Sequence, residues 1–205
     1  MRIILLLIVT ALISCKSDSS DSTASASENL KTEATGNKSA TKGKVETNFN
    51  KNGIPDACDL LTQETIAKYV GIPASSIMLA DGSSSKNDLQ RACFFKWDGS
   101  EIKNAGVMVQ VQQNPVAGDV PDYLTYMVQG LKTEGENTME GTNTKFKDWS
   151  GFGDDGAYST EVGKYVWRVG NDWAFMIAFN TTMSARDQQK AANAFAKEVM
   201  KRMTF

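Results

Sequence analysis

Histidine is absent from the 205-residue sequence. It is the commonest general base near neutral pH and the commonest metal ligand in proteins. Its absence excludes hydrolysis by a Ser/His/Asp triad, catalysis by a Cys/His pair and the usual zinc sites. Chemistry that depends on carboxylates, lysine or tyrosine stays open. We therefore expect no bound metal and no cofactor.

The low net charge and the lack of aromatic residues near the N-terminus limit which partners the protein can bind and where its core can lie. The formal net charge is only −2, and Lys and Arg form no block. The electrostatic footprint of a nucleic-acid-binding protein is therefore missing. No aromatic residue lies between positions 16 and 48. The hydrophobic core must be built from the part of the chain that follows.

An apolar run occupies residues 3–13, directly after Arg2. It is too short to span a bilayer as a helix, which takes roughly 20 residues. A positive charge followed by a short apolar run is typical of a secretory signal peptide. The sequence therefore predicts an exported protein.

The run ends at Leu12-Ile13-Ser14-Cys15, which resembles the lipobox of bacterial lipoproteins. The resemblance implies a signal peptide over residues 1–14, cleavage between Ser14 and Cys15, and diacylation of Cys15. Two or three acyl chains are enough for stable membrane anchoring. An ordinary secretory signal with an incidental cysteine is the alternative.

Lys16 follows the cysteine. In enterobacterial sorting, Asp at that position favours retention in the inner membrane, so we expect the outer membrane rather than the inner one. Residues 15–52 are rich in Ser, Thr, Lys and Glu and carry too little apolar surface to order themselves, which predicts a disordered tether. A coil of ~37 residues spans roughly 33 Å. Within it, Asp21-Ser22-Thr23 resembles the O-glycosylation motif of Bacteroidetes, making Ser22 a candidate site; chance occurrence in a Ser-rich tract is the alternative.

Residues 53–205 carry the periodic patterns of a globular domain. Thr62 as N-cap and Gly71 as terminator predict a helix over residues 63–70. A second helix is expected over residues 121–133, and a third after Ser184. Strands are expected at residues 91–97, 107–112, 157–160, 165–169 and 173–179, with loops over 80–88 and 136–145. This order predicts an α+β fold with a mainly antiparallel sheet, helices packed on it, and residues 173–179 as a central strand.

Cys58 and Cys93 are the two cysteines that remain after Cys15. In an exported domain a pair of cysteines indicates a disulfide. Closing a loop of ~35 residues stabilises a domain by roughly 3–4 kcal/mol in the chain-entropy model. Two buried free thiols are the alternative.

The segment over residues 56–62 reads Asp-Ala-Cys-Asp-Leu-Leu-Thr and precedes a predicted helix. It resembles the opening of a family of actinobacterial cell-envelope lipoproteins of unknown function. In that family a second cysteine lies just before an aromatic residue on a strand, as Cys93 does here. The run Gly-Phe-Gly-Asp-Asp-Gly-Ala-Tyr over residues 151–158 is also similar. The family is associated with the α/β/α sandwich of the photosystem subunit PsbP, whose relatives mostly act in binding or assembly.

Asp154 and Asp155 lie between two glycines and could bind a cation or serve as the acids of a hydrolase. The residue spacing of a calcium loop is missing, and a polar turn is the alternative. Trp149 and Phe152 sit in the same Gly-rich loop segment and are candidates for contact with a ligand or partner. Packing in the core is the alternative for both.

These observations favour a membrane-anchored lipoprotein that is not an enzyme and that presents a binding or assembly domain in the cell envelope. Its expected partners are the membrane, through the lipid, and an envelope protein or a small apolar ligand, with no nucleic acid. The alternative is an envelope hydrolase that uses carboxylates near Asp154 and Asp155. The two differ in geometry: a deep cleft with a second acid favours the enzyme, and an exposed turn favours the binding domain.

Overall fold

The computed structural model describes residues 53–98, 101–138 and 141–203. The predicted signal peptide (1–14), the cleavage site at Ser14 and Cys15, the tether (15–52) and Ser22 lie outside the described residues. The predicted globular region is the part that the structure shows.

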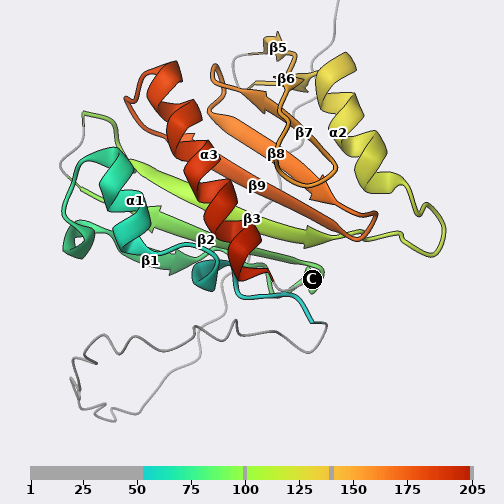
Figure 1. Ribbon diagram of the computed structural model, residues 1–205, viewed down its shortest axis with the longest axis horizontal. Helices are drawn as coiled ribbons and strands as arrows, with labels where there is room; N and C mark the ends of the chain where they lie inside the picture. Colours follow the sequence, from blue (N-terminus) through green and yellow to red (C-terminus); the bar gives the residue numbers. More distant parts are fainter. Residues whose placement is uncertain (1–52, 99–100, 139–140, 204–205) are drawn as a thin grey trace, which may run out of the picture. The chain divides into compact units, whose positions relative to one another are not determined.

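A seven-stranded antiparallel sheet forms the centre of this region (Figure 1). Its strands are β1 (Met78–Asp81), β2 (Gln90–Lys96), β3 (Gly106–Gln113), β6 (Lys147–Asp148), β7 (Asp155–Ser159), β8 (Lys164–Val169) and β9 (Trp173–Asn180). The order across the sheet is β1-β2-β3-β9-β8-β7-β6. β9 is therefore the middle strand, as its apolar pattern predicted. A separate pair, β4 (Glu136–Asn137) and β5 (Asn143–Thr144), forms a small antiparallel ribbon.

The helices are α1 (Gln63–Val70), α2 (Tyr123–Thr133) and α3 (Ala185–Arg202), with two 3₁₀ helices, η1 (Ala57–Asp59) and η2 (Ala74–Ser76). The Oγ1 of Thr62 accepts a hydrogen bond from the Thr65 amide, so Thr62 caps α1 as predicted. Ser184 caps α3 in the same way, by accepting from the Asp187 amide. Gly71 ends α1 in the left-handed region, with a φ of 76° that favours glycine. Mixed helices and an antiparallel sheet confirm the predicted α+β class.

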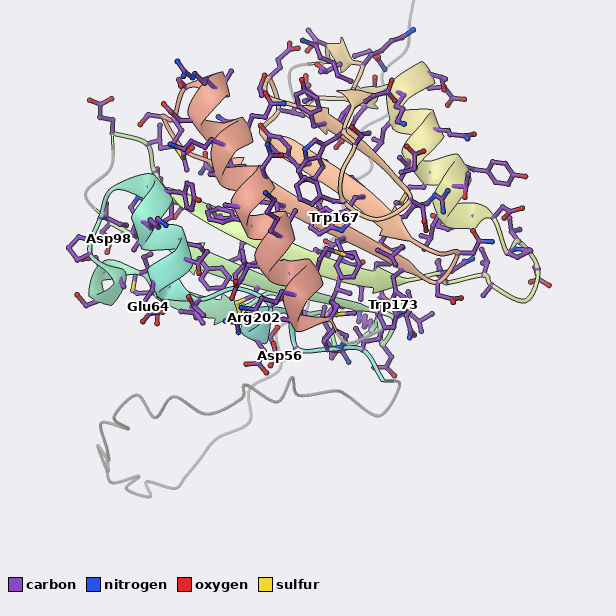
Figure 2. All side chains as sticks on the ribbon, in the orientation of Figure 1. Asp56, Glu64, Asp98, Trp167, Trp173 and Arg202 are labelled. Carbon is purple, nitrogen blue, oxygen red and sulfur yellow. A yellow bond between two sulfur atoms is a disulfide. The ribbon has the colours of Figure 1, made fainter. Side chains whose placement is uncertain are left out.

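Helices α1 and α3 pack on one side of the sheet, which we call the covered side. Its positions alternate with those of the other side at the period of two expected for strands. Trp167 on β8 is fully buried beneath α3, where its ring stacks on Phe175 and its Nε1 donates to the Sδ of Met200 at 3.4 Å (Figure 2). Phe195 of α3 stacks on Phe179 of β9. This side therefore holds the main hydrophobic core.

Helix α2 packs on the opposite side, over β7 and β8. Val128 of α2 is fully buried there, together with Ala157 of β7, Val166 of β8 and Phe146. This second cluster is much smaller than the main core, because α2 lies over only part of the sheet. Among the described helices, none combines the length and apolar character needed to cross a membrane.

The structure differs from the sequence-based expectation in two regions predicted to be loops. Residues 80–88 include the end of β1, whose side chains are mostly exposed and therefore lack a strand-like alternation. The polar stretch 136–145 contains the β4–β5 ribbon, which is too short to show a pattern. In both regions backbone pairing with a neighbour, rather than local sequence, defines the strand.

Candidate functional site

The side of the sheet that carries α2 is left uncovered over β1, β2 and β3 and over part of β9, as far as the described residues go. We call this area the open side. Its positions alternate with those of the covered side. Ala92, Gly106 and Ala174 are buried, and the others are half-buried or exposed: Met78, Ala80, Gln90, Phe94, Lys96, Met108, Gln110, Gln112, Met176, Ala178 and Asn180. Apolar side chains and amides predominate. An apolar surface of this kind on a folded domain is a candidate contact site.

Two hollows lie on the open side. The first, of about 160 Å³, lies between α2 and the sheet and is bordered by Met127, Leu131 and Met176. The second, of about 420 Å³, is bordered by Lys96, Met108 and Ala178, with other residues of β2, β3 and β9. Because Met108 pairs with Ala178 and the next pair on this side is Gln110 with Met176, the two hollows are neighbours along β3 and β9. We call the two together the trough.

The cations on the α2 side of the sheet have carboxylate partners near the helix. Lys164 Nζ contacts both oxygens of Glu136, at 2.5 and 2.6 Å. Arg168 lies 3.8 Å from Asp154. Lys96 differs from both: its Nζ lies over the Phe94 ring, 5.1 Å from the ring centroid.

Lys132 of α2 holds the helix to the end of the sheet. Its Nζ lies 2.8 Å from Asp148 of β6 and 2.6 Å from Asp155 of β7. Burial of the Lys132 ammonium works against its charged form, but the hydrogen bonds that it donates to Asp148 and Asp155 outweigh this effect and raise the pKa of Lys132 above its ordinary value. The helix is therefore fixed electrostatically over β7, and its Met127 and Leu131 border the smaller hollow of the trough.

Trp149 and Phe152, the aromatic candidates from the sequence, are both buried in the main core, at 4% and 8% exposure. The Nε1 of Trp149 donates to Oδ1 of Asn193 on α3 at 2.9 Å, and the Trp149 ring contacts those of Tyr165 and Trp167. Both residues therefore hold the loop before β7 against the covered side. The partner on α3 is distant in sequence, so the loop composition gave no sign of it.

Asp154 and Asp155, the candidate carboxylates, border a shallow hollow of about 190 Å³ formed by their own loop. The Asp154 side chain is 58% exposed, and its Oδ2 accepts a hydrogen bond from the Gly170 amide at 2.6 Å. Asp155 pairs with Lys132 and also accepts from the Gly156 amide. Each carboxylate thus has a partner within the fold. Within the described ranges, no group of three or more acidic or cysteine side chains lies close enough together to hold a metal ion.

Cys58 and Cys93 form a disulfide, which confirms the prediction. Cys93 lies on β2 on the covered side and is fully buried, and Cys58 belongs to η1. Arg202, near the end of α3, donates from Nη1 to the Asp59 carbonyl at 2.8 Å; Figure 2 shows Arg202 beside the segment that carries Asp56. The covalent bond and this hydrogen bond attach the start of the domain to the covered side.

The open side was not identified from the sequence. A signal was present in β9, where Ala174, Met176 and Ala178 alternate with large aromatic and aliphatic residues. Small side chains at these positions favour a helix packed on that side of the strand. In the structure α3 packs on the large side chains instead, and α2 lies mainly over β7 and β8.

Comparison of the chain with protein-family models, with curated proteins and with solved structures finds no match. The function of the domain is therefore inferred from its own residues.

Proposed function

We propose that this chain is a lipid-anchored protein of the bacterial cell envelope whose domain is a non-catalytic binding or assembly module. The observation that carries the proposal is the open side. Half of one side of the sheet lacks a covering helix among the described residues, and it presents Phe94, Met108 and Met176. Binding sites are commonly concave and mostly apolar, with a few polar groups that fix orientation.

The anchoring part of the proposal depends on the N-terminal sequence. A short apolar run that ends at Ser14-Cys15 resembles a lipobox, and residues 15–52 have the composition of a flexible tether. A tether of that length gives the domain reach from the membrane surface. The resemblance to actinobacterial envelope lipoproteins, with their PsbP-like fold, supports the same function class. Because Lys16 rather than Asp follows Cys15, the proposed location is the outer membrane rather than the inner one.

The binding part of the proposal is supported by the arrangement of carboxylates. Asp154 is exposed and bonded to a backbone amide, and Asp155 is paired with Lys132. A hydrolase of the carboxylate type needs two acids positioned about a substrate. The hollows of the open side offer one acid among the described residues, Glu136 in the smaller hollow, and its carboxylate is paired with Lys164.

Metabolic labelling with an alkyne analogue of palmitate tests the anchor. The wild-type chain is expected to carry the label, and Cys15→Ala is expected to lose it and to keep its signal peptide. Intact mass of the native protein provides a second measurement. An unacylated Cys15 in the native protein would contradict the anchoring proposal.

Photo-crosslinking in cells tests the binding surface. Benzoylphenylalanine at Gln110, on the open side, is expected to give a covalent adduct with a bound molecule. The matched control is benzoylphenylalanine at Lys197, an exposed position on α3. Equal adducts at both positions, or none at Gln110, would contradict the assignment of the open side as the binding surface.

A further inference from the structure

We infer that the trough binds a long-chain fatty acid, with the acyl chain along β3 and β9 and the carboxylate at Lys96. This inference rests on the proposed binding function of the open side and names the ligand class. Three observations carry it: the apolar lining, the length of the trough and the position of one cation.

The lining suits a flexible hydrocarbon chain. Met127 of α2, Met108 of β3 and Met176 of β9 border the two hollows, together with Leu131 and Ala178. Methionine side chains are unbranched and adaptable, and they contact apolar ligands of variable shape well. No side chain of β3 or β9 on this side carries a charge, among the described residues.

The length of the trough fits one acyl chain. From the row of Gly106 and Asn180 to the row of Gln112 and Ala174, the strands advance by six residues. At about 3.4 Å per residue this is roughly 20 Å. Half of the ~30 Å hydrocarbon core of a bilayer, about 15 Å, is the length of a chain in one leaflet. A long-chain fatty acid therefore extends over most of the trough.

The charge at one end selects an anionic head group. Lys96 is the one charged residue among the open-side positions of the described β1, β2, β3 and β9. It borders the larger hollow, whereas Lys164 is already held by both oxygens of Glu136. A cation that pairs with no carboxylate of the described residues, at the end of an apolar trough, complements a fatty acid in both shape and sign.

The test uses the full chain in phosphatidylcholine nanodiscs and a palmitic acid that carries a photoreactive diazirine. After irradiation, mass spectrometry is expected to locate adducts within β3 and β9. Unlabelled palmitate is expected to compete, and 1-hexadecanol, which has the same chain and a neutral head, is expected to compete at least threefold less well. Adducts spread over α1 and α3, or equal competition by hexadecanol, would overturn the inference.

Variants sharpen the test. Lys96→Met is expected to lower labelling about three- to fivefold, the range of a partly exposed ion pair. The matched control is Lys68→Met, because Lys68 also lies over an aromatic ring, that of Tyr69, but on α1 away from the trough. Ala178→Trp fills the trough and is expected to abolish labelling while the denaturation midpoint stays unchanged. Equal labelling of the Lys96 and Lys68 variants would overturn the inference.

The outcomes separate this inference from the proposed function. If phosphatidylglycerol in the nanodisc competes as strongly as palmitate, the occupant is a bilayer lipid and the fatty-acid assignment is overturned. If the diazirine probe fails but benzoylphenylalanine at Gln110 still gives a specific adduct, the binding module stands and its ligand belongs to another class. If the probe labels the trough but Cys15 is unacylated, the fatty-acid inference stands and the anchoring proposal fails.

Discussion

The two sides of the sheet are built from the same strands, yet they differ in almost every respect. On β9, Phe175, Ile177 and Phe179 face α3 and are buried, whereas Met176 and Ala178 alternate with them on the open side and are only half-buried. The covered side contains stacked aromatic rings, a disulfide and a long amphipathic helix that packs on the sheet. Most of the packing that stabilises the domain therefore lies on the covered side, and packing constrains the residues of the open side less.

The largest expected difference between the sides comes from removing an aromatic ring from each. Trp167→Ala empties a fully buried site on the covered side and is expected to lower the free energy of unfolding by about 3–5 kcal/mol. Phe94→Ala, on the open side, is expected to lower it by only about 1 kcal/mol. Urea denaturation followed by tryptophan fluorescence or circular dichroism measures both. Similar losses for the two variants would show that the open side also carries core packing.

Removal of the disulfide tests the covered side alone. Cys58→Ala with Cys93→Ala opens a loop of 35 residues and is expected to lower the free energy of unfolding by about 3–4 kcal/mol, because the unfolded chain gains conformational freedom. Under conditions where this variant stays folded, crosslinking from Gln110 is expected to be unchanged. A loss of crosslinking in the folded variant would show that the disulfide shapes the open side as well.

The smallest expected effect concerns pH, which should act on the α2 side through Lys132. Its pKa is raised in the folded state, so the stabilisation by Asp148 and Asp155 is fully present below about pH 10.5 and is lost as the pH rises through the folded value. At pH 7, Lys132→Met is therefore expected to lower the free energy of unfolding by up to about 1 kcal/mol relative to the parent. As the pH rises above 10.5, the free energy of unfolding of the variant is expected to fall less than that of the parent. Urea denaturation at a series of pH values provides the measurement.

Tyr165 titrates in the same pH range and needs a control. Burial raises the pKa of its hydroxyl, with a smaller contribution from Tyr158, so ionisation of the unfolded state also lowers stability above about pH 10. The buried hydroxyl has no hydrogen-bond partner among the residues that the structure describes, so Tyr165→Phe is expected to lower the free energy of unfolding little at pH 7. Lys132→Met should therefore be compared with its parent in a Tyr165→Phe background. If the free energy of unfolding fell by the same amount at alkaline pH in Tyr165→Phe with and without Lys132→Met, the role of Lys132 would be contradicted.

The elements with strong periodicity could be predicted from the sequence. Helix α1 has the predicted bounds, because Thr62 and Gly71 give local start and stop signals. The central position of β9 followed from its aromatic and aliphatic side chains, and the Cys58–Cys93 pair followed from cysteine number and expected compartment. These features depend on interactions close in sequence or on composition.

The open side and the burial of the Trp149 loop could not be predicted in the same way. The ion pairs of Lys132 with Asp148 and Asp155 determine which part of the sheet α2 covers. Both carboxylates lie well apart from Lys132 in the sequence. The indole of Trp149 is fixed by Asn193, 44 residues away. Long-range partners of this kind leave no local pattern, so sequence reasoning placed the candidate contact at the aromatic loop.

The disulfide also determines what a protease can do to this domain. The loop it closes contains α1, β1 and the exposed turn that carries Lys86. A trypsin cut after Lys86 would leave two polypeptides that stay covalently joined through Cys58 and Cys93. On a denaturing gel such a nicked chain would migrate as one species without reductant and as two with it. The N-terminal fragment would stay attached to the rest of the domain through the disulfide.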